Sequence, residues 1–450
     1  MSKKIAVCLS VLSLLAFAGD AAAELCTIDD VPAATLLVPY FEVDLNDPNG
    51  VTTLFSVNNA SASATIAHVT LWTDESIPSL DFDIYLTGFD VQTINVRDLF
   101  NGVLPRTADD GEDPSDTISP QGPLSQDINF PGSTGPCGQI YNAPPTPTLT
   151  ATIIGHIEAA HTGNFSSVYG GCLGANYGDG IARGYITVDV ANQCNLEFPN
   201  SAGYFLAGGA GLAGNRNILW GDYFYVDSAN NFAQGETLVH IEACSSPAVG
   251  NGAGRCPFVP GDYTFYGRYV AADASDGREP LATTFATRYI EGGLFDGGTD
   301  LIVWRDAKTD TASAHACGSR FAWVPLNQAD VVAFDEDENP EDLCFRGDNV
   351  SPPTGGSDTC FPLETQRVSL SGSIVPFGDT PGPSNPFGWM YLNLNTDTTA
   401  VGGLAAYGGT AQAWVTTVMS ALGKFSVGFD AVQLDTACDT VPGTGVILLP

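Results

Sequence analysis

Alternation of apolar and polar residues with a period of two constrains this chain more than any other feature of its sequence. In the stretch 51–74, Thr53, Phe55 and Val57 would share one face of an extended strand, and the same alternation returns at 67–71. A period of two is typical of half-buried antiparallel β-strands, because successive side chains point to opposite faces. Small residues separate the two runs, so the stretch predicts a β-hairpin.

A second stretch, 283–306, follows the same plan in the other half of the chain. A Thr-Thr pair opens both stretches, and Trp72 and Trp304 lie 20 and 21 residues after Thr52 and Thr283. In both stretches an Asp follows two positions after the Trp. The recurrence predicts that the two tryptophans are core anchors of related hairpins and not binding sites.

Another strand pattern repeats further along, in the same order. Residues 184–190 (GYITVDV) align with 388–394 (GWMYLNL), so that a Gly-aromatic pair opens each alternating run. Each run precedes an expected closing hairpin, formed by 218–226 with 237–243 in the first half and by 413–434 in the second. Two repeats in matching order predict an internal duplication, although all β-sandwiches share alternating strands.

Short alternating runs and 50 Gly and 29 Pro residues indicate many strands and turns. No capped helical segment of about 12 residues or more is evident, so we predict an all-β protein. The repeats predict two tandem, duplicated antiparallel β-sandwich lobes with long Gly/Pro/Asp-rich loops, at 24–245 and 262–450. A linker at 246–261, with one expected disulfide, separates the lobes.

Residues 1–23 have the composition of a cleaved secretory signal. Lys3 and Lys4 form a basic start, an apolar run covers 5–18, and three alanines precede Glu24. The apolar run is too short to span a membrane, and no longer one follows. We therefore expect an exported protein (periplasmic, cell-surface or secreted) with no transmembrane segment in the mature chain.

Eleven cysteines become ten once Cys8 leaves with the signal. An even number in an oxidising compartment predicts disulfides, and the C-x-x-C spacing of zinc ligands does not occur. The sequence alone leaves the connectivity open. The candidates with the tightest spacing are Cys172 with Cys194, Cys244 with Cys256, and Cys344 with Cys360.

The charge is strongly acidic, with 51 Asp and Glu against 16 Lys and Arg and a net charge of −35. Such a surface repels nucleic acid and anionic lipid, and it attracts divalent cations or basic partners. The hydrophobic content of 44% excludes general disorder. A saline habitat would explain the acidity equally well.

Two acidic loops are candidate calcium sites, because Ca²⁺ takes carboxylate and carbonyl oxygens from loops. Neither loop fits the spacing of an EF-hand, and solvated acidic loops are the simpler interpretation. The candidate ligands are Asp109, Asp110 and Asp113 in the first loop and Asp335, Asp337 and Glu338 in the second.

A transition-metal site is a further hypothesis, based on the repeated tetrapeptide HIEA. We expect 153–159 to be a strand, so that His156 and Glu158 share a face, as His240 and Glu242 would in theirs. Two paired strands of this kind would bring two His and two Glu together. The alternative is that these residues form the solvent side of amphipathic strands.

No familiar catalytic motif occurs: the sequence lacks a GxSxG elbow, an HExxH helix and a P-loop. Our first hypothesis is therefore a non-catalytic exported protein that works by surface contact, in adhesion, envelope or matrix structure, with no cofactor beyond calcium. One alternative is a secreted carbohydrate-active hydrolase with paired carboxylates in a cleft between the lobes. Another is a calcium-dependent binding module.

Overall fold

The computed structural model describes residues 30–105, 149–244, 258, 260, 262–270, 273–306, 313–318, 330–343, 361, 363–370, 383–395 and 412–435. In these ranges, strands dominate, and the helices are the short α2 (Val96–Phe100) and α4 (Ala151–His161) and a 3₁₀ turn (Ala207–Gly209). All pairings between these strands are antiparallel. The all-β prediction is confirmed.

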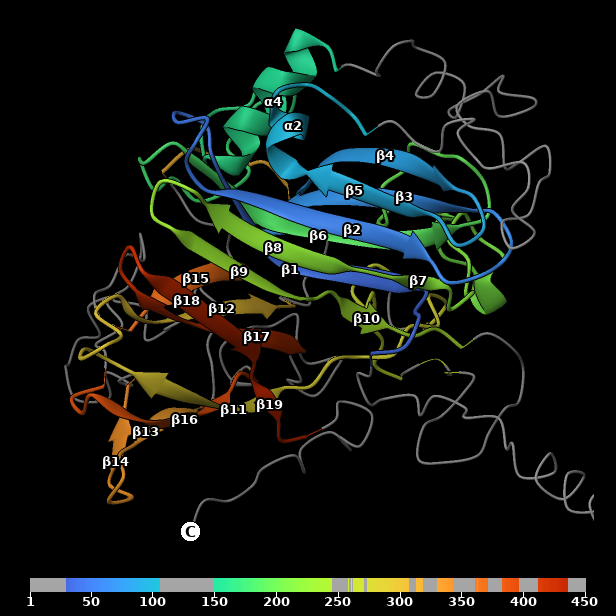
Figure 1. Cartoon of the computed structure of the whole chain (residues 1–450). Helices are drawn as coiled ribbons and strands as arrows, with labels where there is room; N and C mark the ends of the chain where they lie inside the picture. The colour runs from blue at the N-terminus through green and yellow to red at the C-terminus, as the bar shows by residue number, and fades with distance from the viewer. Residues whose placement is uncertain are drawn as a thin grey trace, which may run out of the picture.

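The first half of the chain forms two sheets (Figure 1). Sheet 1 has the order β10-β1-β6-β3-β4, with β1 Thr35–Asp44, β3 Thr65–Thr73, β4 Pro78–Leu86, β6 Ile181–Ala191 and β10 Val239–Ile241. Sheet 2 has the order β5-β2-β8-β9, and β7 also pairs with β2; its strands are β2 Thr52–Asn59, β5 Val91–Asn95, β7 Leu219–Trp220, β8 Asp222–Asp227 and β9 Phe232–Thr237.

The second half forms two more sheets. Sheet 3 has the order β15-β12-β17-β18, with β12 Gly298–Arg305, β15 Thr365–Ser369, β17 Ala413–Ala421 and β18 Phe425–Asp430. Sheet 4 has the order β14-β13-β16-β11-β19, with β11 Thr284–Ile290, β13 Asp330–Phe334, β14 Pro340–Asp342, β16 Phe387–Asn393 and β19 Val432–Gln433. Among the described strands, no pairing joins one half to the other.

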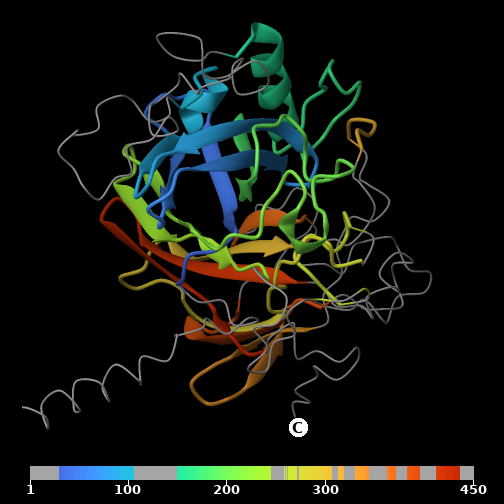
Figure 2. The same ribbon diagram turned by 90° about the vertical axis from the view of Figure 1, so that its right-hand side faces the viewer.

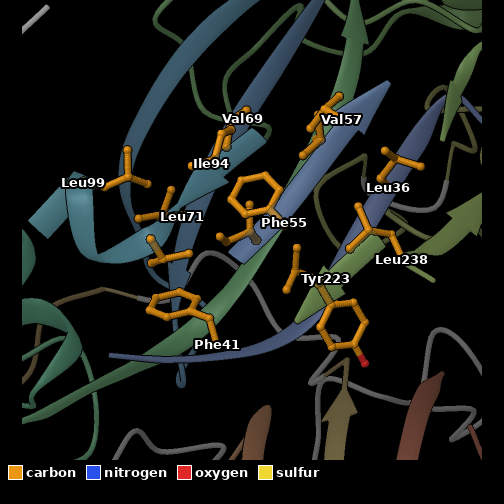
Figure 3. Packing of buried hydrophobic residues seen from close by; sticks show 14 of the residues in the cluster. Leu36, Phe41, Phe55, Val57, Val69, Leu71, Ile94, Leu99, Tyr223 and Leu238 are labelled. Carbon is orange, nitrogen blue, oxygen red and sulfur yellow. The ribbon is translucent and has the colours of Figure 1, made fainter. Parts of the chain in front are cut away.

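Sheet 3 is a central layer, between the first half of the chain and sheet 4 (Figures 1 and 2). Leu301 and Val303 of β12 pack into the core shared with sheet 4. The intervening Ile302 joins the core of the first half, where Phe55, Leu71 and their neighbours pack (Figure 3). Strand β12 therefore contributes apolar side chains to the cores on both faces of sheet 3.

Both Thr-Thr stretches form strands at the expected residues, but the hairpin prediction is wrong in both. Strand β2 belongs to sheet 2 and β3 to sheet 1, while β11 belongs to sheet 4 and β12 to sheet 3. Each link therefore crosses between sheets and does not close a pair. The period of two indicates which residues of a strand share a face. It does not indicate which other strand pairs with it.

The duplication is not confirmed, because the repeated strands choose different neighbours. In the first half the Gly-aromatic strand β6 pairs with β3, and the closing hairpin β8–β9 pairs with β2. In the second half β16 pairs with β11, and the hairpin β17–β18 pairs with β12. The hairpin expected within 413–434 forms, whereas the strand expected at 237–243 becomes β10 in sheet 1.

The strand expected at 153–159 is also wrong, since these residues lie in helix α4. Thr150 caps the helix, its side chain accepting a hydrogen bond from the backbone N–H of Ile153. The buried residues His156, Ile157, Ala160 and His161 recur at the spacing of one helix face. The same apolar residues are compatible with a short strand, and the N-cap decides between the two.

Covalent and ionic contacts fasten the two halves together. A disulfide joins Cys172 to Cys317, 145 residues apart. The guanidinium of Arg367 lies 2.7 Å from Glu42, and His315 lies 2.7 Å from Glu75. Specific covalent and polar contacts therefore hold the two halves together, in addition to buried apolar side chains.

Candidate functional site

Two edge strands, β9 of sheet 2 and β18 of sheet 3, lie side by side at the junction of the halves (Figures 1 and 2). The Ser426 hydroxyl donates a hydrogen bond of 2.7 Å to the carbonyl of Ala233. Gln234 occupies the space where a side chain at Gly428 would be, since a Cβ there would lie 1.8 Å from its Nε2. Side-chain contacts thus join β9 and β18, and we call this junction the seam. Among the described strands, β9 and β18 are not paired through their backbones.

A cleft of about 300 Å³ opens beside the C-terminal ends of the two seam strands. Both halves of the chain contribute to its walls. The lining residues are Asp30, Thr237, Leu238 and His240 from the first half and Trp414, Asp430, Ala431 and Gln433 from the second. No lysine or arginine is among these lining residues.

Asp430 is the last residue of β18, and two hydrogen bonds hold its carboxylate at the cleft. Its Oδ1 accepts hydrogen bonds from the Trp414 indole at 3.2 Å and from the Thr416 hydroxyl at 2.8 Å. Burial raises the pKa of Asp430 to about 6, against the opposing effect of these hydrogen bonds, and the charge of Asp30 raises it further. The second oxygen of Asp430 takes no part in either hydrogen bond.

Glu236 lies near the end of β9, on the neighbouring strand of the seam. Burial raises the pKa of Glu236 to about 7, and the nearby charge of Asp430 adds to the rise. Its Oε1 accepts a hydrogen bond of 3.2 Å from Gln234. The negative charge of Asp430, from the other half of the chain, thus favours the protonated form of Glu236.

His240, from β10, forms part of the cleft wall and is only 3% exposed. Burial lowers its pKa, against the raising effect of the Val31 backbone and the Asp30 charge. The ring is therefore neutral at neutral pH. Its Nε2 accepts a hydrogen bond from the Gly221 N–H at 3.3 Å, so Nδ1 carries the proton. The Val31 backbone acts on the ring, but it does not meet the geometry of a hydrogen bond to Nδ1.

The cleft and the adjoining Glu236 thus combine carboxylates of raised pKa with one buried donor and an apolar wall. Perturbed carboxylates in a concave site are typical of functional sites, because proteins otherwise avoid burying like charges together. This arrangement can bind a cation or exchange protons with a ligand. It was not found from the sequence, where Glu236 and Asp430 are ordinary strand residues with no motif around them.

The metal hypothesis based on the HIEA repeat is wrong. His156 lies in α4, where its Nδ1 contacts the Ser166 hydroxyl at 2.7 Å and its ring stacks on Tyr169. His240 lies in β10 of sheet 1, beside the cleft described above. The helix places the first tetrapeptide on a different kind of element, so the two cannot pair as strands.

In the second calcium candidate, hydrogen bonds within the loop already engage the carboxylate of Asp335. Asp335 Oδ1 accepts hydrogen bonds from the backbone N–H groups of Asp337 and Asn339, and these together with the Asn339 side chain lower the pKa of Asp335. In the described part of the chain, no three His, Cys, Asp or Glu side chains lie close enough to hold a metal ion. Asp335, Asp337 and Glu338 therefore gain no support as ligands.

Several other expectations lie outside the described residues: the signal at 1–23, the loop with Asp109, Asp110 and Asp113, and Cys256, Cys344 and Cys360. The pairing of Cys172 with Cys194 is wrong, because Cys172 bonds to Cys317. Cys194 and Cys244 are also disulfide-bonded. Close spacing along the chain failed here because the fold brings Cys317 from the other half to Cys172.

Two serine–histidine pairs were also missed. His161 Nε2 lies 2.6 Å from the Ser79 hydroxyl, and its Nδ1 contacts the Arg183 carbonyl at 2.8 Å. Ser79 is 6% exposed, and burial lowers the pKa of His161 to about 4. Ser166, the partner of His156, is 1% exposed. Inaccessible hydroxyls beside weakly basic imidazoles indicate structural hydrogen bonds.

The fold and the cleft together define an all-β protein with an acid-lined site between the two halves of its chain. The chain matches no protein-family model, no curated protein and no solved structure. None of the helices in the described ranges is long and apolar enough to cross a membrane.

Proposed function

We propose that the protein is exported and acts by surface contact, and that the cleft at the seam binds basic groups of its partner. Export is supported by the composition of residues 1–23 and by the disulfide between Cys172 and Cys317, since such bonds persist in oxidising compartments. Adhesion, envelope and matrix roles are all compatible with this kind of binding.

One observation carries the proposal: Glu236 and Asp430 converge beside a cleft whose lining residues include no cationic side chain. Burial raises the pKa values of both carboxylates, and the charge of Asp430 adds to the rise at Glu236, so the negative charge here is only partly stabilised within the protein. A ligand cation would provide that compensation. The net charge of −35 would also speed the approach of a basic partner.

The test is binding of a polycation to the full mature chain at near-physiological salt. Poly-L-lysine is the probe, polyglutamate the negative control, and the comparison is between the wild type and the double variant Glu236→Gln/Asp430→Asn. We expect binding to the double variant to be about tenfold weaker or more. Polyglutamate should not bind to either protein.

A matched control separates the cleft from the general acidity of the surface. Glu158→Gln/Asp98→Asn removes one Glu and one Asp charge from exposed positions on α4 and α2. The control should bind poly-L-lysine like the wild type. Equal losses in both double variants would reject the cleft as the binding site.

A second candidate is the carbohydrate-active hydrolase, favoured by the same two carboxylates. With a pKa of about 7, Glu236 would be partly protonated at neutral pH and could act as general acid, while Asp430 would be largely ionised and could act as base or nucleophile. Turnover of chromogenic glycosides that is abolished by Glu236→Gln alone would establish it. A panel without any turnover would leave the binding function as proposed.

A further inference from the structure

We propose that the cleft is a receptor for one lysine residue of a polypeptide partner, with the ammonium group held by Asp430 and Asp30 and the alkyl chain laid along the apolar wall. This inference rests on the proposed function and narrows it to one side-chain chemistry. The following observations about the cleft carry it.

The size of the cleft suits a single side chain. Its volume of about 300 Å³ lies at the lower end of the range of ligand sites in proteins. Trp414, Leu238 and Ala431 form an apolar part of the lining, next to the carboxylates of Asp30 and Asp430. A long aliphatic stem with a charged head matches that division, because such side chains bury the stem and keep the head in polar surroundings.

The apolar wall argues against an inorganic cation as the natural occupant. Calcium takes six to eight oxygen ligands, whereas half of the second-half lining here is the indole of Trp414 and the methyl group of Ala431. An ammonium group needs fewer partners, since it donates only three hydrogen bonds. The face of an indole also attracts organic cations.

The buried Nδ1–H group of His240 can donate a hydrogen bond to the ligand, and a simple ammonium group has no acceptor for it. Its side chain is 97% buried at the cleft wall, and the neutral ring carries its proton on Nδ1, which lacks a partner of full hydrogen-bond geometry. A ligand that also offers an acceptor would satisfy this donor. The backbone carbonyl of a lysine residue provides one at the base of the same side chain.

The occupant would contact both halves of the chain at once. Leu238 and His240 belong to the first half, and Trp414 and Asp430 to the second, across the seam of β9 and β18. Binding would therefore hold the seam strands together. Amide exchange in β9 and β18 should slow when the cleft is occupied.

The test uses N-acetyl-lysine N-methylamide as the probe and N-acetyl-norleucine N-methylamide as its control without the ammonium group. Calorimetry on the full mature chain should detect the lysine derivative and not the norleucine derivative. Asp430→Asn should weaken binding about tenfold or more, and Glu158→Gln/Asp98→Asn should leave it unchanged.

A measurement on the unaltered protein guards against misfolding of the variants. Asp430 lines the cleft with Asp30 and His240 and interacts electrostatically with Glu236, and protonation of the cleft carboxylates removes the charge that holds the ammonium. Affinity for the lysine derivative should therefore fall severalfold between about pH 8 and pH 5. Equal binding of both derivatives, or affinity that does not change with pH, would overturn the inference.

The two proposals can fail separately. If poly-L-lysine binding depends on Glu236 and Asp430 but the lysine derivative does not bind, the cleft recognises charge density and the single-residue receptor is rejected. If neither probe depends on the cleft, both proposals are rejected.

Discussion

Trp72 and Trp304 meet the same ring, that of Tyr185, from opposite halves of the chain. Trp72 stacks on Tyr185 at a centroid distance of 5.7 Å and an interplanar angle of 4°, and Trp304 approaches its edge at 5.9 Å and 77°. Both tryptophans are almost fully buried in one cluster. The two repeated tryptophans are thus joined through one tyrosine ring, in a cluster to which both halves contribute.

Replacing Trp72 by alanine should destabilise the protein by about 3–5 kcal/mol, because a large cavity opens beside Tyr185 and the Thr187 hydroxyl loses the indole donor at 2.9 Å. Denaturant unfolding measures the change. Trp389→Ala is the control, since that side chain is 38% exposed on sheet 4. A loss at Trp389 equal to that at Trp72 would contradict the central role of the cluster.

Removing the disulfide by Cys172→Ser/Cys317→Ser should lower the free energy of unfolding by about 2–4 kcal/mol, since the bond restricts the unfolded chain. Peptide mapping of the unreduced protein by mass spectrometry checks the connectivity independently. A cross-linked peptide that contains Cys172 and Cys194 would contradict the structure.

Arg278→Leu should destabilise the protein by about 3–5 kcal/mol. The guanidinium is fully buried, lies 3.7 Å from Asp189 and donates hydrogen bonds to Asn215 and to the Gly214 carbonyl. Its loss removes the donor to these two acceptors and leaves the buried carboxylate of Asp189 without its paired cation. Arg288→Leu, at an exposed position of β11, should change the free energy of unfolding by less than about 0.5 kcal/mol.

The side chain of Asp430 should stabilise the folded protein more at about pH 5 than at about pH 8, whereas the buried His161 and His240, whose pKa values are lowered, act in the opposite direction. The pKa of Asp430 is raised to about 6 in the folded protein, above the ordinary value of an aspartate, so the folded state binds protons more tightly than the unfolded chain. The resulting stabilisation is complete below the unfolded pKa and is lost as the pH rises through about 6. Asp81, also raised to about 6, and Glu236, raised to about 7, act in the same direction.

Thermal melting at constant ionic strength, in steps of pH, tests this dependence. Asp430→Asn should flatten the profile by on the order of 1 kcal/mol between the two ends of the range. Glu158→Gln should keep the slope of the wild type, because that carboxylate is exposed. Identical pH profiles for the wild type and Asp430→Asn would contradict the raised pKa of Asp430.

Much of the local structure could be predicted from the sequence. The strands at 52–59, 65–73, 284–290 and 298–305 lie where the alternation places them, because the period of two is a local property of an extended chain. Helix α4 escaped prediction since its apolar residues suit either period over so short a run. The capping hydroxyl of Thr150 was the available signal.

The candidate site could not be predicted, for a different reason. Glu236 and Asp430 are 194 positions apart, and nothing near either residue distinguishes it from the other acidic residues of the chain. Their pKa values are raised only because two edge strands from different halves lie together and withdraw both side chains from water. The pairing of Cys172 with Cys317 depends on the same long-range packing.

The sequence by itself determined the all-β class, the positions of most described strands and the buried state of Trp72 and Trp304, since these follow from local alternation and residue type. Only the tertiary structure decided which strands pair, which cysteines bond, and that acidic residues from both halves line one cleft. These outcomes depend on contacts between segments that are far apart in the sequence. The free energy of such contacts cannot be inferred from any single stretch of the chain.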